Sequence, residues 1–168
     1  MAYRNRVFVS FDGDSDISYY RLMLAWKQSD HSSFNFYNAH ELSSARDSST
    51  EYSIKASLQE RLRHSKVFVL LVGANTKYLY KFVRWEIEQA LKRELPIICV
   101  NLNGVRYLDR ENCPAILREE LAMHVSFNSK IIEYALDNWP AQHSRSILDG
   151  KTGAYYYSDS IYSSLGSK

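Results

Sequence analysis

The chain has 168 residues, which is enough for one domain with a single core and short for two. Hydrophobic residues make up 45% of it and charged residues 24%, and no apolar run approaches the roughly 20 residues that a transmembrane helix needs. The net charge of +2, with both signs intermixed, lacks the strong basic field of duplex-binding proteins, so the composition argues against nucleic-acid and membrane partners.

The start of the chain and its cysteines favour a cytoplasmic protein. The first apolar run, at 7–11, is cut short by Asp12, and no cleavage site of small residues follows, so we expect no export signal. Cys99 lies in an apolar stretch and Cys113 precedes a proline, which fits neither a disulfide framework nor metal-ligand spacing. A reducing cytoplasm is the simplest location.

The first half of the chain alternates predicted strands and helices. Residues 6–11 (RVFVSF) alternate β-forming residues and lead into an acidic loop of turn residues, which indicates a strand and its exit. Apolar periodicity predicts helices at 17–27 and 51–64, with a short strand at 34–37 between them. The polar, serine-rich stretch 38–50 is either a plain connection or a binding loop.

The second half begins with a strongly apolar strand. Residues 67–72 (VFVLLV) are apolar without alternation, which is typical of a central strand covered on both faces in a parallel sheet. The other predicted elements are a helix at 78–93, a buried strand at 97–100, a short helix at 114–121, a weak edge strand at 125–127 and a helix at 131–139 that Pro140 ends. Strands and helices thus continue to alternate.

This order of elements predicts an α/β fold. Four or five strands alternating with helices favour a central parallel sheet with right-handed crossovers, flavodoxin-like rather than barrel-like because eight units are lacking. We expect residues 1–140 to form one domain. The tyrosine- and serine-rich tail, 141–168, either packs over the edge of the sheet or is disordered.

The sequence lacks the motifs of several common enzyme and nucleotide-binding classes. Its six glycines form neither a dinucleotide fingerprint nor a P-loop, and the central strand ends in Leu71, Val72 and Gly73 where a receiver domain would need an aspartate. There is no G-x-S-x-G elbow, and neither cysteine has the context of a nucleophile. The five histidines lack ligand spacing, so we expect no metal site.

Glu86 is the leading candidate residue because it lies in a strand, loop and helix unit at 67–91. Ligands of α/β proteins collect at the carboxyl ends of parallel strands, where such a unit builds a site. At about 100° per residue, Glu86 falls on the border of the core-facing stripe of its helix, whereas Glu88 lies about 200° away, so the two cannot form a carboxylate pair. From this pattern alone, a solvated glutamate near the positive end of the helix dipole is the commoner explanation.

Five segments in order carry a family resemblance: RVFVSF with its acidic exit, ELSSARDSST, SKVFVLLVGANT, KFVRWEIEQAL and ELPIICVNL. The fourth is the most specific, since it is similar to a W-V-x-x-E-I helix. Over residues 5–139 the segments together resemble the TIR-like proteins, and particularly the TIR subunit of Thoeris antiphage defence systems. The resemblance implies the TIR-like, three-layer form of the flavodoxin-like fold.

The chain departs from the family pattern in two places. Phe82 stands where the family commonly has tryptophan, while Trp85 comes directly before the glutamate. The tyrosine-rich tail has no counterpart in a minimal TIR domain, so the resemblance does not extend to it.

The resemblance implies a reaction that one carboxylate can catalyse. Catalytic members of the family cleave NAD and release nicotinamide, and Glu86 takes the place of their catalytic glutamate. An anion beside the ribose stabilises the oxocarbenium charge that develops as nicotinamide departs, with NAD as substrate and no metal or cofactor. Water as acceptor gives ADP-ribose, whereas a group of the same molecule gives a cyclic isomer.

Five further residues are expected to border the same crevice and bind substrate. Ser10, Phe11 and Asp12 end the first strand, and Asn75 follows the central strand. Arg46, on the loop opposite, is a candidate for the pyrophosphate. Plainer explanations remain: Asp12 can simply end the strand, Phe11 can belong to the core, and Arg46 can be a solvated charge.

The implied function is a cytoplasmic NAD-cleaving enzyme that makes a cyclic ADP-ribose-type signal for a separate effector in antiphage defence. A phage-derived trigger and a homo-oligomer are further partners that this function suggests. Two alternatives stay open. One is a non-catalytic TIR-like scaffold that recruits partners through its loops and helices, and the other is a small nucleotide-binding protein of flavodoxin-like shape.

Overall fold

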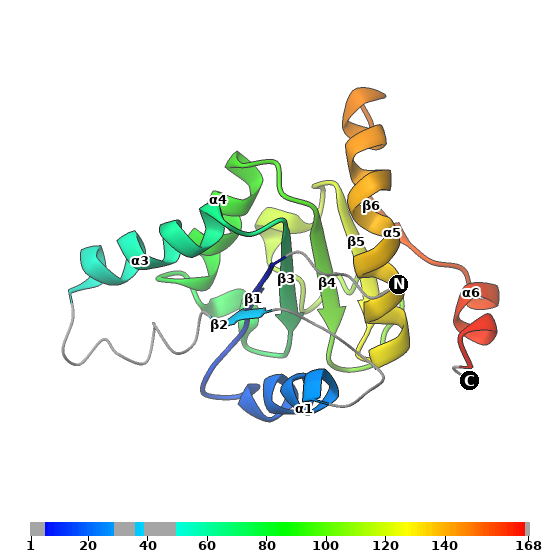
Figure 1. Ribbon diagram of the computed structural model, residues 1–168, viewed down its shortest axis with the longest axis horizontal. Helices are drawn as coiled ribbons and strands as arrows, with labels where there is room; N and C mark the ends of the chain where they lie inside the picture. The colour runs from blue at the N-terminus through cyan, green and yellow to red at the C-terminus, as the bar shows by residue number, and fades with distance from the viewer. Residues whose placement is uncertain (1–5, 29–35, 39–49, 167–168) are drawn as a thin grey trace.

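The computed structural model describes residues 6–28, 36–38 and 50–166, which form a parallel sheet with helices on both faces (Figure 1). The strands of this part of the chain are hydrogen-bonded in the order β2-β1-β3-β4-β5-β6, and every neighbouring pair is parallel. The strands are β1 (Val7–Ser10), β2 (Phe36–Asn38), β3 (Val67–Val72), β4 (Ile97–Asn101), β5 (Ala122–Ser126) and β6 (Ala154–Tyr156). The helices are α1 (Ile17–Gln28), α3 (Glu51–Arg63), α4 (Val83–Lys92), α5 (Ser129–Leu148) and α6 (Asp159–Ser164), and the 3-10 turns are η2 (Thr76–Tyr78) and η3 (Ala115–Leu117).

The predicted α/β fold with a central parallel sheet in three layers is confirmed. Strand β3 lies inside the sheet, and all 6 of its residues are buried, as its apolar run without alternation predicts. Strands β1 to β5 correspond to the predicted strands, whereas β6 comes from the C-terminal tail and adds a further strand to the sheet.

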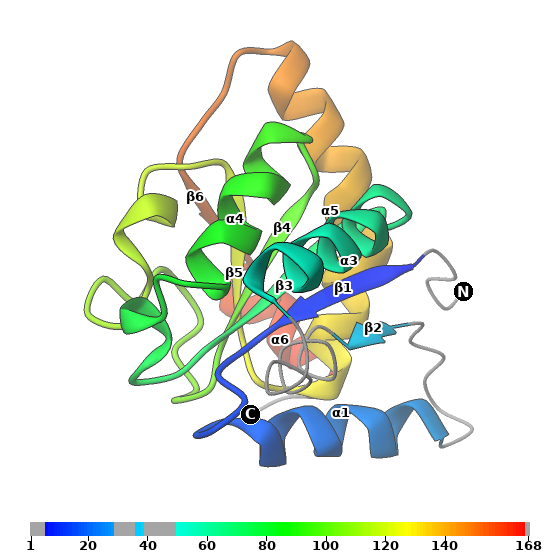
Figure 2. The same cartoon turned by 90° about the vertical axis from the view of Figure 1, so that its left-hand side faces the viewer.

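Alternation along the strands divides the core into two layers. Val7 and Val9 of β1 pack on the face that α1 and α5 cover, whereas Phe8 packs on the face that α3 and α4 cover. Figure 2 shows α3 and α4 on the side of the sheet away from α5. The side chain of Ser10, two positions after Phe8, therefore faces α4.

Helix α3 shows how local sequence positions one of these layers. The Thr50 side chain accepts a hydrogen bond from the backbone N–H of Ser53 and so caps the first turn. Ile54, Leu58 and Leu62 recur every four residues, which places them on one buried face against the sheet. Burying a side chain of this size stabilises the fold by about 1.5–3 kcal/mol.

Helix α4 begins later than predicted. The apolar pattern indicated a helix at 78–93, but residues 76–78 form the 3-10 turn η2 and the α-helix begins at Val83. Leu79 leaves helical geometry with a ψ of 79°, and Phe82, at the N-cap of α4, makes no side-chain capping hydrogen bond. Apolar spacing alone therefore extended the predicted helix too far towards its N-terminus.

Two predicted elements before α5 differ from the structure in extent or position. Residues 114–121 form only the short turn η3 rather than a helix of that length. The strand predicted at 125–127 begins earlier, at Ala122, and it is an interior strand because β6 pairs with its outer side. The second difference arises because the tail that covers this edge of the sheet is far away in sequence.

Pro140 does not end helix α5, contrary to the prediction. The helix continues to Leu148, and its buried face extends beyond the proline to His143 and Ser146. Proline removes one backbone hydrogen bond, but this continued packing holds the helix together past that point. Although α5 has 20 residues, neither it nor another helix in the described ranges is long and apolar enough to cross a membrane.

The end of the described chain packs against the preceding domain. Strand β6 pairs with β5, and Tyr162 of α6 is fully buried. The Tyr162 hydroxyl accepts a hydrogen bond from the backbone N–H of Ser126 at the end of β5. Residues of the tail thus share one core with α1 and α5. The division of the chain at residue 140 into a domain and a tail stays a prediction.

Candidate functional site

The order of the strands creates a switch point at the carboxyl ends of β1 and β3. From β1 the chain passes to β2 on one side, and all later strands lie on the other side. Ligands of open α/β sheets bind in the crevice outside the carboxyl ends of the strands at such a point. The loops that follow β1 and β3, at 11–16 and 73–75, therefore border the candidate site.

Ser10 and Glu86 meet beside this point from two different elements. Ser10 is the last residue of β1, and Glu86 lies in the first turn of α4. The Ser10 hydroxyl donates a hydrogen bond to Glu86 Oε1 over 3.4 Å. The structure thus brings together the predicted catalytic residue and one of the predicted substrate-binding residues.

Glu86 is a buried carboxyl group rather than a residue at the border of the helix stripe. It is 2% exposed, and its Oε2 atom has no hydrogen-bond partner among the described residues. Burial raises the pKa of Glu86 to about 8 because the charged form loses its hydration, and the hydrogen bond from Ser10 lowers that pKa in part. Buried carboxyl groups with such a shift are found preferentially at functional sites.

Asp12 organises the loop between β1 and α1. Its Oδ1 atom accepts hydrogen bonds from the backbone N–H groups of Asp14 (3.0 Å) and Ser15 (3.3 Å), which forms an Asx turn. The Asn75 side-chain amide donates to Ser15 Oγ over 3.2 Å and so links this loop to the loop after β3. Asp12 and Asn75 therefore shape the border of the crevice, and their contact with substrate stays a prediction.

A contact between Asp16 and Gly73 was missed by the sequence reasoning. A Cβ atom at Gly73 would lie 2.3 Å from Asp16 Oδ2, so only glycine lets this carboxyl group approach the backbone so closely. Asp16 is buried, and burial together with the negative charge of Asp12 raises its pKa. The glycine directly after the central strand is the one signal in the sequence that could have indicated this contact.

The structure does not place Phe11 or Arg46 beside Glu86. Phe11 is buried, and its ring stacks on Tyr20 of α1 with the ring centroids 4.8 Å apart, so it packs with the α1 and α5 layer. Arg46 lies outside the described residues. The roles of both residues towards substrate stay predictions.

The residues next to Glu86 in the sequence lie in surroundings that differ in their exposure and contacts. Glu88 is exposed and pairs with Arg84 over 3.3 Å, so it points away from Glu86 as helical geometry predicts. Phe82 is buried in the core, whereas Trp85 is partly buried with Lys55 Nζ of α3 5.3 Å from its ring centroid. The two aromatic residues thus occupy different environments before the glutamate.

Glu86 lies apart from two hollows on the surface of the molecule. One has a volume of about 180 Å³ between α4 and η3, and the other about 380 Å³ between the loop after β4 and the segment 156–159. Glu86 lines neither of them. Among the described residues, no group of three His, Cys, Asp or Glu side chains could hold a metal ion, and Cys99 and Cys113 are buried free thiols.

The parallel sheet with its switch point at β1, and the buried glutamate on the helix after β3, place the chain in the TIR-like class of α/β proteins. The chain matches the family described as Thoeris protein ThsB, TIR-like domain, over residues 8–107. Since this match covers more than half of the 168 residues, the chain belongs to that family. No curated protein matches the chain. The matched range includes both Ser10 and Glu86.

Proposed function

We propose that the protein cleaves NAD at the bond between nicotinamide and ribose. It uses NAD as substrate without a metal or further cofactor, works in the cytoplasm, and converts the ADP-ribose part into a cyclic nucleotide. That diffusible signal then activates a separate effector in antiphage defence. The observation that supports this function best is the buried carboxyl group of Glu86 beside the switch point, in a chain that belongs to the TIR-like family.

The reaction needs an anion close to C1′ of the ribose. When the glycosidic bond breaks, its electron pair leaves with nicotinamide, which becomes neutral, and positive charge develops on the ribose as an oxocarbenium ion. The Glu86 carboxylate stabilises this charge, and the effect is strong where water is excluded. The burial of Glu86 supports this role, since it provides surroundings of low dielectric constant.

The raised pKa of Glu86 fits a carboxylate that forms when NAD binds. With a pKa of about 8, the group is mostly neutral at pH 7 in the free protein. The nicotinamide ring of NAD carries a positive charge, and an opposite charge nearby lowers the pKa of a carboxyl group. Bound NAD therefore favours the ionised form of Glu86 that its own cleavage requires.

The acceptor at C1′ decides which product forms. If water adds to C1′ and loses a proton, the product is ADP-ribose. If a nitrogen or oxygen atom of the same molecule adds and loses its proton, a cyclic isomer forms instead. Enclosure of the reacting carbon from water decides between the two products, because it withholds the water that gives ADP-ribose.

A comparison of three proteins tests this function. Wild type, Glu86→Gln and Glu88→Gln are incubated with NAD, alone and with extract of phage-infected cells, and the small molecules are separated by chromatography. We expect wild type and Glu88→Gln to release nicotinamide, and Glu86→Gln to do so slower by about 10²-fold or more, because it cannot supply the anion.

Two results would contradict the proposal. Equal nicotinamide release by wild type and Glu86→Gln would remove the catalytic role of Glu86. A wild-type protein that releases no nicotinamide under any of these conditions, including concentrations at which it self-associates, would instead support the non-catalytic scaffold.

A further inference from the structure

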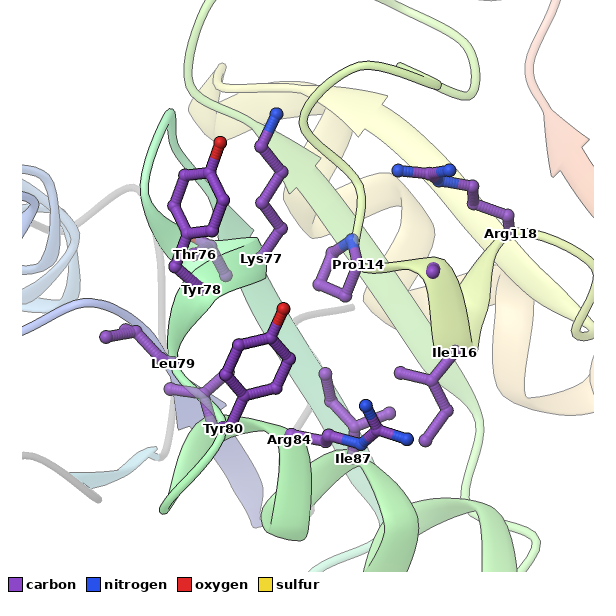
Figure 3. Close-up of a pocket in the computed structure, with 12 residues that line it drawn as sticks. Thr76, Lys77, Tyr78, Leu79, Tyr80, Arg84, Ile87, Pro114, Ile116 and Arg118 are labelled. Atoms are coloured by element: carbon purple, nitrogen blue, oxygen red, sulfur yellow. The ribbon is translucent and has the colours of Figure 1, made fainter.

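A groove lies on another flank of helix α4, between η2 and η3 (Figure 3). It has a volume of about 180 Å³. Its apolar lining residues are Leu79, Val83, Ile87, Pro114, Ala115 and Ile116. Every charged residue that lines it is a cation, namely Lys77, Arg84 and Arg118, and we therefore call it the basic groove.

Two of these cations are held by backbone carbonyl groups. Lys77 Nζ donates to the carbonyl oxygen of Glu111 over 2.6 Å, and Arg118 Nε donates to the carbonyl oxygen of Cys113 over 3.0 Å. Within the described part of the chain, neither pairs with a carboxylate, whereas Arg84 pairs with Glu88. Lys77 and Arg118 are thus positioned with their charges unneutralised, towards the same end of the basic groove in Figure 3.

Exposed aromatic rings stand beside these charges. Tyr78 is 61% exposed and Tyr80 is 64% exposed, although both rings offer large apolar surfaces. The Arg84 guanidinium lies 5.9 Å from the centroid of the Tyr80 ring. Tyrosine and arginine supply much of the binding energy at protein interfaces, because they combine a large contact area with a polar end. The residue types around the basic groove are therefore those of a protein-binding surface.

We propose that the basic groove binds an acidic peptide segment of a partner protein. One large apolar side chain of the segment fills the groove, and carboxylates on either side of it contact Lys77 and Arg118. Charge complementarity sets the acidic character of the partner, since the lining contains three cations and no carboxylate.

The volume of the groove favours a peptide segment over a small molecule as its occupant. Pockets for small ligands have volumes of roughly 300–1,000 Å³. A groove of about 180 Å³ has room for one anchoring side chain, with the rest of the segment lying across the surface. The basic groove does not include Glu86, so this proposal is independent of NAD cleavage and is tested by binding alone.

Selection from a displayed library of random peptides tests the proposal with the full-length protein. We expect the enriched peptides to share one Phe, Trp or Leu flanked by Asp and Glu. The enriched peptide, labelled with a fluorophore, is then titrated with wild type, Arg118→Glu and Tyr80→Ser. The control is Arg21→Glu, which makes the same charge change at an exposed site of α1, on the other face of the sheet.

Fluorescence anisotropy should show a dissociation constant raised about tenfold or more by Arg118→Glu, since an attractive contact becomes repulsive. Arg21→Glu should bind like wild type, and added salt should weaken wild-type binding. Tyr80→Ser breaks none of the hydrogen bonds from Lys77 and Arg118, so it tests the groove without disturbing the loop at 111–113 and should also weaken binding.

Three outcomes would overturn the proposal. The first is a selection without enrichment of acidic residues. The second is unchanged binding by both folded variants, with folding checked by thermal unfolding. The third is displacement of the peptide by millimolar inorganic phosphate or ATP to the same extent as by unlabelled peptide, which would identify the basic groove as a site for small anions.

Discussion

Ser10 and Glu86 are 76 positions apart in the chain, yet the Ser10 hydroxyl donates a hydrogen bond of 3.4 Å to Glu86 Oε1. The bond joins the end of β1 to the first turn of the helix that follows β3, its neighbour in the sheet. It satisfies one oxygen of a buried carboxyl group, and the other oxygen has no partner among the described residues. The hydrogen bond therefore fixes the position of the proposed catalytic group and partly offsets the rise in its pKa that burial causes.

The pH dependence of NAD cleavage should follow the ionisation of Glu86. Its pKa of about 8 in the free protein means that the carboxylate forms only as the pH rises towards that value. We expect kcat/KM for nicotinamide release to increase about tenfold per pH unit below the pKa and to level off above it. At saturating NAD the plateau should begin at lower pH, because the positive nicotinamide ring stabilises the carboxylate. A profile that falls between pH 6 and 8 would contradict this role.

Removal of the Ser10 hydroxyl should shift that profile. The hydrogen bond lowers the pKa of Glu86, so Ser10→Ala raises it and moves the rising part of the kcat/KM profile to higher pH. The bond is long, so we expect a shift of less than about one pH unit. Ser15→Ala serves as the control, since Ser15 bonds to Asn75 rather than to Glu86. A midpoint that stays in place or moves to lower pH would exclude this effect of Ser10.

Glu86 should also make the protein less stable at alkaline pH. Its pKa lies above the value of 4.5 expected in the unfolded chain, so the folded state holds the proton more tightly, and stability is lost as the pH rises from 4.5 through about 8. Urea unfolding should show that Glu86→Gln gains about 2–4 kcal/mol over wild type between pH 5 and pH 8. Glu88→Gln, at an exposed position, should show no such trend.

Replacement of Gly73 should disturb the two loops that border the site. A methyl group there would lie 2.3 Å from Asp16 Oδ2, so we expect Gly73→Ala to lower the free energy of unfolding by about 1–3 kcal/mol. Asp16→Ala removes the obstructing carboxyl group, and the double variant should regain part of that loss. A double-mutant cycle from urea unfolding measures this coupling. Additive effects would show that the two side chains do not limit each other.

Local patterns in the sequence were sufficient to predict the sheet and the position of Glu86 within the unit after β3. The apolar run of β3 reflects burial on both faces of the sheet, and the four-residue spacing in α3 reflects burial on one face of the helix. In each element the buried residues recur with the period of its backbone geometry. Glu86 was identified through the order of strand, loop and helix together with the family resemblance. These signals need no knowledge of which distant residues meet.

The features that sequence reasoning missed depend on contacts between distant segments. The strand β6 and the buried Tyr162 come from a tail without clear periodicity, and they turn β5 from an edge strand into an interior one. Helix α5 continues past Pro140 because its later turns also pack. Likewise, nothing in the local pattern around Glu86 indicates that Ser10 contacts it, so its burial could not be predicted from the helix alone.

His124 should make the protein sensitive to acid for a reason unrelated to the candidate site. The residue is fully buried in β5, neither ring nitrogen has a partner among the described residues, and burial lowers its pKa from 6.5 to about 4. The unfolded chain takes up a proton below pH 6.5 while the folded protein does not, so stability falls as the pH drops from 6.5 to about 4. His124→Leu should remove this loss, and its advantage over wild type in urea unfolding should grow by about 2–3 kcal/mol from pH 7 to pH 4.5. Met123→Leu, a neighbouring buried replacement without a titratable group, should keep the wild-type pH dependence, and an equal pH dependence of His124→Leu and wild type would show that His124 is not the cause.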